Sequence, residues 1–106
     1  MTAYVEQQLF ALGDATRRAI LERLVEGPLP VGQVAQGLPV SRPAISQHLR
    51  VLERAKLVTH RTSGTRHLYQ LNAEALASLR EYFDELWTQA LAAFKKRVEQ
   101  SSTKER

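Results

Sequence analysis

The chain has 106 residues, of which 43% are hydrophobic and 25% are charged, a balance that fits one folded domain. It has no cysteine, which excludes a disulfide, a thiolate metal site and a thiol redox sensor. No apolar run is long enough to span a membrane, and residues 1–14 lack the basic start of a signal peptide. We therefore expect a cytoplasmic protein with no membrane partner.

The net charge is +4, and it is unevenly distributed along the chain. Residues 38–72 contain six basic residues and one acidic residue, whereas the rest of the chain contains nine basic and ten acidic residues. A positive excess confined to one third of the chain attracts a polyanion such as nucleic acid. A basic helix on a membrane surface is the competing interpretation. It fits poorly, because the basic face has no large apolar residues to insert.

Two short helices are predicted at the start of the chain, over residues 4–12 and from Asp14 or Thr16 to about residue 25. Gly13 ends the first helix, and either Asp14 or Thr16 can cap the second. The second helix has an apolar stripe on one side and arginines on the other; these are Arg17, Arg18 and Arg23. We interpret the arginines as a solvated face, with a phosphate contact as the alternative for the Arg17–Arg18 pair.

The middle of the chain has the order of a helix-turn-helix, over residues 31–56. A break rich in glycine and proline at residues 27–30 precedes a two-turn helix over residues 31–36. A turn with glycine follows, and Ser41 then caps a second helix that runs to about residue 55. This arrangement is typical of proteins whose second helix enters the major groove of DNA.

That second helix has an apolar side and a cationic side. At about 100° per residue, Ile45, Leu49 and Leu52 form the buried stripe. The opposite side and the leading end carry the candidate DNA contacts, which are Arg42, Pro43, Ser46, Gln47, Arg50 and Arg54. An ordinary amphipathic helix with a solvated charged face is the alternative.

The expected roles of these side chains follow from their chemistry and position. Arg42, Ser46 and Gln47 lie in the first two turns and suit base edges. Arg50 and Arg54 lie further along and suit phosphates. His48 is at the edge of the buried stripe, where it either packs against the protein or contacts a phosphate.

A two-stranded antiparallel hairpin is predicted over residues 57–71. Two runs rich in Val, Thr, His, Leu and Tyr flank residues 62–65, in which Gly64 can take a positive φ. Arg61 and Arg66 lie beside the tip. A basic hairpin directly after a DNA-reading helix is typical of a wing that contacts the phosphate backbone or the minor groove. A plain hairpin made soluble by its arginines is the alternative.

One long helix is predicted over residues 73–100, capped by Asn72, with a polar, frayed tail at residues 101–106. Its length is roughly 40 Å at 1.5 Å per residue, so it must overhang a domain of this size. The overhang is apolar, and a second copy of the chain is the simplest cover. Together with residues 4–12 this helix is assigned to a dimer interface, formed by Tyr4, Leu9, Phe83, Trp87, Leu91 and Phe94.

No sequence motif of an enzyme is present, and no nucleophile–base pair or metal triad can be assembled, so neither enzyme activity nor a cofactor is expected. His60 and His67 could face each other across the hairpin, but two ligands are fewer than a transition-metal site usually needs. The acidic residues of the long helix are expected to be solvated or to pair between subunits; they are Glu81, Asp84 and Glu85.

Residues 12–58, LGDATRRAILERLVEGPLPVGQVAQGLPVSRPAISQHLRVLERAKLV, closely resemble the ArsR (ArsR/SmtB-type) winged-helix transcriptional regulators of bacteria and archaea. GDATRRAILERL resembles the second helix of that family, and the SxHLxxLxxxxLV pattern at residues 46–58 resembles its DNA-reading helix. RTSGTRHLYQL, at residues 61–71, resembles its wing. The likeness covers about residues 9–91. It implies a mainly α winged helix-turn-helix with about five helices, a two-stranded wing and a long C-terminal helix at the dimer interface.

The resemblance also implies a function, namely a homodimer that binds a palindromic operator, usually as a repressor. By position it implies DNA contacts from Ser41, Arg42, Ser46, Gln47, His48 and Arg50, and from Arg61 and Arg66 in the wing. Metal-sensing members carry cysteines in the first helix of the motif or Asp/His/Glu sets in the last helix. Residues 31–36 have no cysteine and residues 73–100 no histidine, so the chain looks closer to metal-independent members. A metal-dependent sensor and a winged-helix protein-interaction module remain alternatives, and an unknown small-molecule or protein effector stays open.

Overall fold

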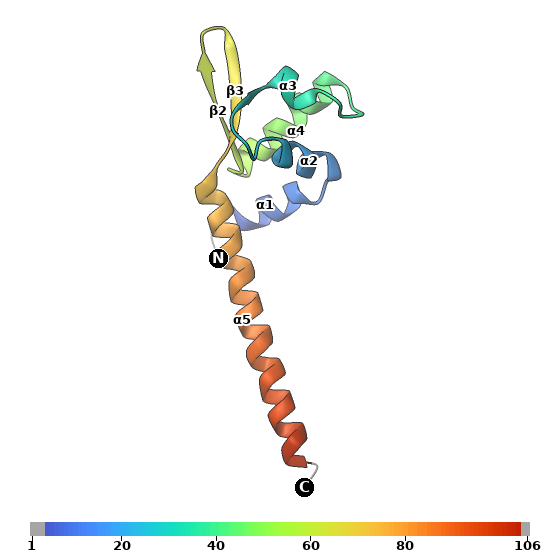
Figure 1. Cartoon of the computed structure of the whole chain (residues 1–106), viewed down its shortest axis with the longest axis vertical. Coiled ribbons are helices and arrows are strands. Elements are labelled where there is room, and N and C mark those ends of the chain that lie inside the picture. Colours follow the sequence, from blue (N-terminus) through green and yellow to red (C-terminus); the bar gives the residue numbers. More distant parts are fainter. Residues whose placement is uncertain (1–3, 105–106) are drawn as a thin grey trace.

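The computed structural model describes residues 4–104 of the chain. The elements in chain order are α1 (Val5–Leu12), α2 (Ala15–Arg23), β1 (Leu29–Pro30), α3 (Val31–Ala35), α4 (Arg42–Arg54), β2 (Val58–Ser63), β3 (Arg66–Leu71) and α5 (Ala73–Lys104). Figure 1 shows a globular head from which α5 extends as a single rod. The molecule measures 72 × 26 × 22 Å along its principal axes. None of the described helices is both long and apolar enough to span a lipid bilayer.

One apolar core holds the head together. The largest fully buried side chains of this core lie on α2 and directly after it, on α3, on α4, and at the start of β2 with the residue before it; they are Ile20, Leu24, Val34, Ile45, Leu49, Leu52, Leu57 and Val58. The predicted buried stripe of α4 is thus confirmed. Each such side chain contributes about 1.5–3 kcal/mol through its removal from water. The core therefore fixes which side of α4 faces outward.

The start and the end of α4 are set by local geometry. Ser41 Oγ accepts a hydrogen bond from the backbone N–H of Ala44 at 3.3 Å, which confirms the predicted N-cap. At the other end Lys56 takes a φ of 65°, and the N–H of Leu57 donates back to the carbonyl oxygen of Leu52 at 3.0 Å. This turn directs the chain from α4 into β2.

The predicted two-stranded antiparallel hairpin is confirmed as β2 and β3, and a third strand that the sequence did not predict joins it, in the order β1–β3–β2. Leu29 pairs with Tyr69 and Pro30 with Leu68. β1 could not be predicted from the sequence, because this strand is only two residues long and contains a proline. Proline cannot donate to a ladder and is restricted to sheet edges. The β2–β3 turn is also tighter than predicted, since β2 continues to Ser63 and Gly64 takes a φ of 63°.

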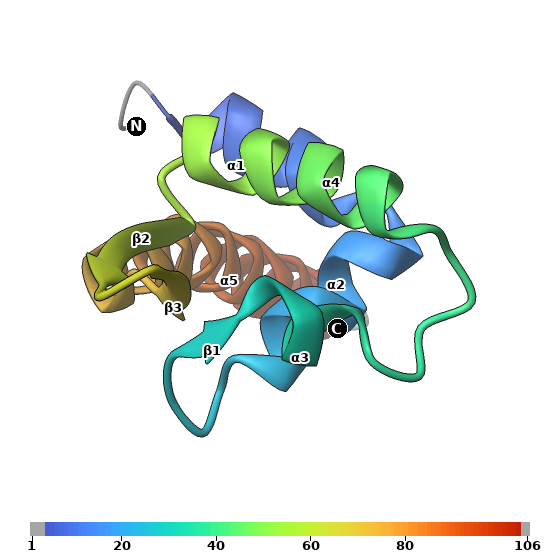
Figure 2. The ribbon, with the colours of Figure 1, turned by 90° about the horizontal axis from the view of Figure 1, so that it is seen from above.

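In Figure 2, which looks down on the head, α4 runs along one edge, with the hairpin near one end and α3 and β1 on the other side of the head. Only the start of α5 belongs to the head, through the buried side chains of Ala75 and Leu79. Beyond them α5 leaves the head and continues to Lys104, four residues past its predicted end. The last two residues of the predicted tail, 105–106, lie outside the described part of the chain.

Candidate nucleic-acid interface

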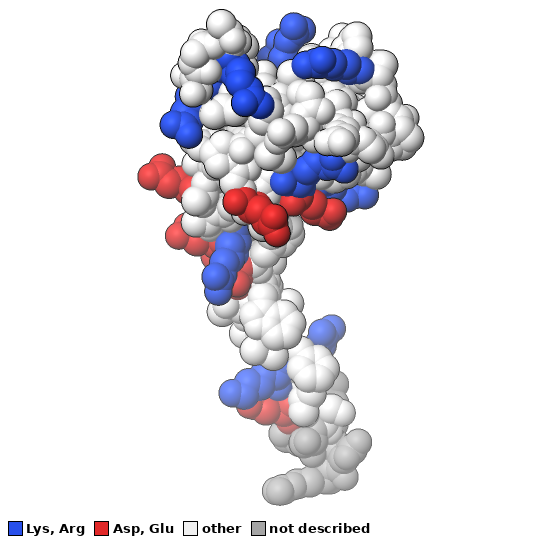
Figure 3. Space-filling model, turned by 45° about the horizontal axis from the view of Figure 1, so that its top comes forward, with Lys and Arg blue, Asp and Glu red and all other residues white. Residues whose placement is uncertain are grey.

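Basic side chains gather on the head, over α4 and the wing formed by β2 and β3. Six such residues lie on α4, on the turn after it and on the wing, and all six are exposed; they are Arg42, Arg50, Arg54, Lys56, Arg61 and Arg66. Among the residues that the structure describes, the ion pairs of His60 with Glu53 and of Arg80 with Asp84 involve none of these six cations, and no carboxylate of the head forms an ion pair with them. Figure 3 shows basic side chains on the head and acidic ones mainly at its junction with α5 and further along the rod. Such a surface attracts a polyanion.

The outward side of α4 carries four of the predicted DNA contacts. Pro43, Gln47, Arg50 and Arg54 are exposed there. Ser46 and His48 are half-buried at its two flanks. The hydroxyl oxygen of Ser41 is already used as the helix cap, so this residue helps to fix the start of the helix. The side of α4 that could enter a groove is therefore centred on Gln47 and Arg54.

Arg42 is directed elsewhere. A Cβ atom built on Gly32 of α3 would lie 3.5 Å from Nη2 of Arg42, so the guanidinium rests on α3. It lines a hollow of about 440 Å³ whose far wall is the wing, through Thr65, Arg66 and His67. The sequence predicted a base-reading role for Arg42 from its place at the tip of the helix, but gave no sign of this contact with α3.

The three arginines of α2 donate to main-chain oxygens, which the interpretation of the Arg17–Arg18 pair as a solvated face did not predict, although Arg18 is itself exposed. Arg17 Nε donates to the carbonyl oxygen of Ala11 at 2.7 Å, and Arg18 Nη1 donates to that of Leu12 at 2.6 Å. Arg23 Nη1 donates to the carbonyl oxygen of Gln36. The last carbonyl groups of a helix have no intrahelical N–H partner. These arginines donate hydrogen bonds to such carbonyl groups at the ends of α1 and α3.

His48 also has a partner that the sequence did not predict. Arg17 Nη1 lies 3.3 Å from its Nδ1 atom. The two residues are 31 positions apart, so no local pattern could have revealed the pair. This contact supports the packing role for His48 and leaves its Nε2 atom as the nitrogen that could meet a phosphate.

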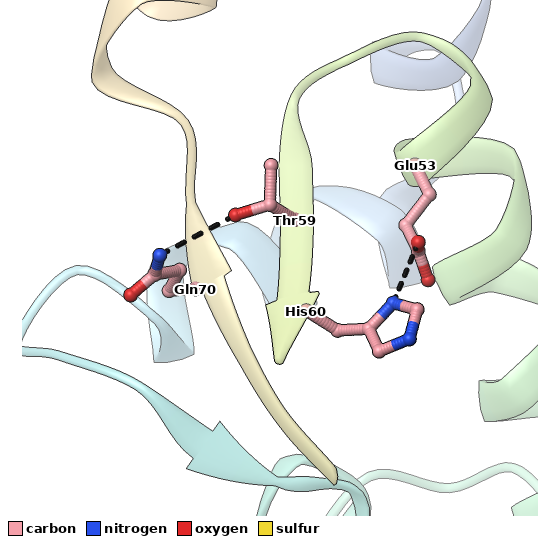
Figure 4. A network of polar contacts seen from close by, with 4 residues as sticks. All are labelled: Glu53, Thr59, His60 and Gln70. Carbon is pink, nitrogen blue, oxygen red and sulfur yellow. Dashed lines mark hydrogen bonds and ion pairs between the residues drawn. The ribbon is translucent and has the colours of Figure 1, made fainter. Parts of the chain in front are cut away.

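The wing is joined to α4 through a histidine. Figure 4 shows His60 Nδ1 bonded to Glu53 Oε2, at 2.8 Å, and Gln70 Nε2 donating to Thr59 Oγ1, at 3.4 Å, across the hairpin. The His60 ring also packs on Tyr69, with ring centroids 5.3 Å apart. Burial raises the pKa of the Tyr69 phenol, and the carboxylate of Glu53 raises it further.

The two wing histidines are neighbours but not cross-strand partners. His60 pairs with Tyr69 in the ladder and His67 pairs with Thr62, so the rings meet diagonally at 5.7 Å. Residues 4–104 contain no group of three His, Asp or Glu side chains that could hold a metal ion.

The predicted interface residues differ in how exposed they are. Phe83, Trp87, Leu91 and Phe94 on α5 are 48–65% exposed. Tyr4 is 41% exposed, and the ammonium of Lys56 lies 5.6 Å from the centre of its ring. Leu9 instead packs against the core of its own head. Most of the uncovered apolar surface is therefore on the rod.

Comparisons with known proteins agree with this geometry. Residues 12–61 match a family described as a helix-turn-helix domain. The chain is 58% identical over 84 residues to the HTH-type transcriptional regulator Rv2034 of Mycobacterium tuberculosis, which covers 79% of this chain and 78% of that protein. It is 36% identical over 76 residues to the arsenical resistance operon repressor of Staphylococcus xylosus, covering 72% of this chain and 73% of the repressor.

A solved structure shares both the fold and part of the sequence. It is the solution structure of the homodimeric winged helix-turn-helix DNA-binding domain of Mb0332 from Mycobacterium bovis, described as a possible ArsR-family regulator. The TM-score is 0.66 at 27% identity, over 83% of this chain and 82% of that domain. Taken together with the exposed basic side of α4 and the wing, these likenesses show that the chain belongs to the ArsR family of winged helix-turn-helix regulators and is a DNA-binding transcriptional regulator, not an enzyme.

Proposed function

We propose that the protein is a homodimeric repressor that binds a palindromic operator, with one α4 helix in each of two successive major grooves. The observation that carries this proposal is the outward side of α4, on which Gln47 is exposed together with Arg50 and Arg54, beside a basic wing. Neither arginine is in an ion pair with a carboxylate of the head. The staphylococcal relative is named as a repressor, which supports repression rather than activation of transcription. Both named relatives are bacterial, and we expect this protein in the cytoplasm with the DNA.

The side chains divide by role. The amide of Gln47 can bond bidentately to adenine, and the hydroxyl of Ser46 can bond to either base edges or phosphates. Arg50, Arg54 and Arg61 supply phosphate contacts, which give most of the affinity and make it fall steeply with salt. A dimer with its two α4 helices about 34 Å apart would match half-sites one turn of DNA apart.

The apolar side of α5 supports a dimer in which two rods pack antiparallel. The exposed stripe is nearly symmetric about a point between residues 90 and 91. When two antiparallel copies meet at that point, Phe83 lies opposite Val98 of the second copy, and Trp87 lies opposite Phe94. Phe83, Trp87, Phe94 and Val98 then each gain an apolar partner, which removes much of the uncovered stripe from water.

The charges of α5 favour the same arrangement. An acidic segment precedes the midpoint and a basic segment follows it; the residues are Glu81, Asp84 and Glu85, then Lys95, Lys96 and Arg97. Antiparallel packing places each acidic segment beside the basic segment of the other copy, whereas parallel packing would place like charges together. The homodimeric state of the Mycobacterium bovis domain also supports this proposal.

The test is selection of bound duplexes from random-sequence DNA at two salt concentrations, followed by sequencing. Recovery of a palindrome with half-sites about one turn apart would support the dimeric repressor and identify its operator. Salt-sensitive binding with no enriched sequence would reduce the function to non-specific DNA coating. No binding at either concentration would favour the protein-interaction module instead.

A further inference from the structure

We propose that the hollow between α3 and the tip of the wing is a binding site for one phosphodiester group of DNA, held jointly by Arg42 and Arg66. The inference rests on the proposed DNA binding and assigns Arg42 to affinity and register, not to base selectivity.

The hollow is lined by cationic and neutral side chains and by no acidic ones. Its polar side chains are Gln33, Arg42, Thr65, Arg66 and His67, and no carboxylate is among its lining residues. Guanidinium groups donate only, and they match the oxygens of a phosphate bidentately. At about 440 Å³ the hollow is larger than one phosphate, and it is open to solvent at the surface of the head. Such a set of donors suits an anion.

The direction of the Arg42 side chain excludes it from the outward side of α4. Arg42 and Glu53 are eleven residues apart, about three helical turns, so they lie on the same side of the helix. Glu53 faces β2, where it bonds to His60. Arg42 therefore faces the wing as well, and its guanidinium rests beside Gly32 with Nη2 3.5 Å and Cζ 3.9 Å from the position of a Cβ on that glycine.

The two walls of the hollow are joined by the unpredicted strand. β1 pairs with β3 through Leu29–Tyr69 and Pro30–Leu68, and α3 begins at the next residue. Arg66 is the first residue of β3, directly after the Gly64–Thr65 turn. The ladder thus holds the wing tip next to α3, and it places Arg42 and Arg66 on the lining of one hollow before DNA arrives. Walls that are already in place lose less conformational freedom on binding.

This arrangement separates the positioning of the protein on DNA from the recognition of bases. A phosphate held between α3 and the wing sets how deeply α4 enters the groove, because both walls are joined through the sheet to the head that carries α4. Gln47, on the outward side, is then left to discriminate between bases. Arg42 affects every sequence equally, since every duplex presents the same phosphate.

The test uses the full chain and the operator recovered by selection, with affinity measured by fluorescence anisotropy at several salt concentrations. The variants are Arg42→Gln, Arg66→Gln, the double variant, and Gln47→Ala as the base-reading control. Each DNA of a panel with single base-pair changes is measured with each variant. Arg42→Gln should weaken binding by a similar factor, about tenfold, across the panel, whereas Gln47→Ala should flatten the differences within it.

The double variant gives the sharper result. The salt slope counts neutralised phosphates, and a dimer carries two copies of the hollow. Removing both arginines from one phosphate in each protomer should therefore lower the slope by about two, not four. The affinity losses should also be less than multiplicative, because the two side chains share a ligand. A slope change of about four, or fully independent losses, would overturn the shared site.

Substitutions at Gly32 test the hollow without touching either arginine. A Cβ at 3.5 Å from Arg42 is an ordinary contact, so Gly32→Ala should bind DNA as the wild type does. Gly32→Glu places a carboxylate beside the guanidinium and should reproduce the sequence-independent loss of Arg42→Gln. If wild type binds its operator but Arg42→Gln alters the preference at one base pair with an unchanged salt slope, this inference fails and the proposed function stands. If wild type binds no DNA, the proposed function itself fails.

Discussion

The Nη1 atom of Arg17 lies 3.3 Å from Nδ1 of His48, and this contact links α2 to the DNA-binding helix α4. The same guanidinium donates to the carbonyl oxygen of Ala11 at 2.7 Å and lies over the ring of Phe10, 5.4 Å from its centroid. One side chain thus joins three helices. Because a guanidinium has no acceptor, Nδ1 of His48 must accept, and the ring of a neutral His48 carries its proton on Nε2.

Replacing Arg17 should therefore weaken the head. Arg17→Gln leaves the carbonyl of Ala11 and Nδ1 of His48 without their donor, and we expect a loss of about 1–3 kcal/mol in the free energy of unfolding. Equilibrium unfolding in urea measures it. Arg80→Gln is the matched control, because it removes an exposed ion pair with Asp84 and should change stability by less than about 0.5 kcal/mol. Equal effects for the two variants would contradict the linking role of Arg17.

The cap of α2 makes part of the stability depend on pH. The backbone N–H of Arg17 donates to Asp14 Oδ1 at 3.0 Å and holds the pKa of that carboxyl below its usual value of 3.8, against a smaller opposing effect of desolvation. Since the folded pKa is lower than the unfolded one, the contribution is complete above about pH 4 and is lost as the pH falls through the folded value.

Thermal unfolding of Asp14→Ala and wild type tests this. The melting temperature of the variant should be lower at pH 7, and the difference should shrink as the pH falls below about 4. Asp14→Asn keeps an acceptor at the cap but does not titrate, so its advantage over Asp14→Ala should stay constant with pH. A wild-type advantage that was as large at pH 2 as at pH 7 would show that the charge of Asp14 adds nothing to its role as a cap.

The uncovered stripe of α5 leads to a prediction about assembly. Phe94 is 58% exposed in the single chain, and it would lie opposite Trp87 of a second copy. Phe94→Glu places a charge in that apolar contact, so sedimentation should detect monomers and operator affinity should fall at least tenfold. Gln89→Glu, on the polar side of α5, should remain dimeric. A Phe94→Glu protein that sediments as a dimer would refute this interface.

Local pattern was enough to predict much of this fold. Ser41 and Asn72 were predicted as caps, and both accept from backbone N–H groups, of Ala44 at 3.3 Å and Glu74 at 3.2 Å. The buried stripe of α4 followed from helical periodicity, and the hairpin from its turn residues. These features depend on residues a few positions apart, where the sequence gives direct evidence.

The unpredicted features join distant parts of the chain. β1 pairs with residues about forty positions away, and Arg42 contacts α3 across the turn of the motif. The carbonyl oxygens that bind Arg17, Arg18 and Arg23 belong to other elements, so no spacing could reveal them. For the interface this matters most at Arg42, since its position at the tip of α4 suggested base contacts whereas its side chain faces the wing.

The tip of the wing provides a last prediction, on Gly64. This residue takes a φ of 63°, and no atom lies within 4 Å of a Cβ built on it. A larger side chain there meets open space, so any loss of stability comes from the backbone alone. Gly64→Val should cost about 1–2 kcal/mol, because a β-branched residue strongly resists this conformation, and Gly64→Asn should cost clearly less.

The same two variants separate the shape of the wing from its charge. Both keep Arg61 and Arg66, so a loss of operator affinity in Gly64→Val alone would mean that the tight turn positions the basic wing on DNA. Urea unfolding gives the stability difference, and anisotropy below the unfolding range gives the affinity. If Gly64→Val and Gly64→Asn are equally stable, the positive φ is not what this position requires. If both bind the operator as tightly as wild type, a precise turn at the tip is not needed for DNA binding.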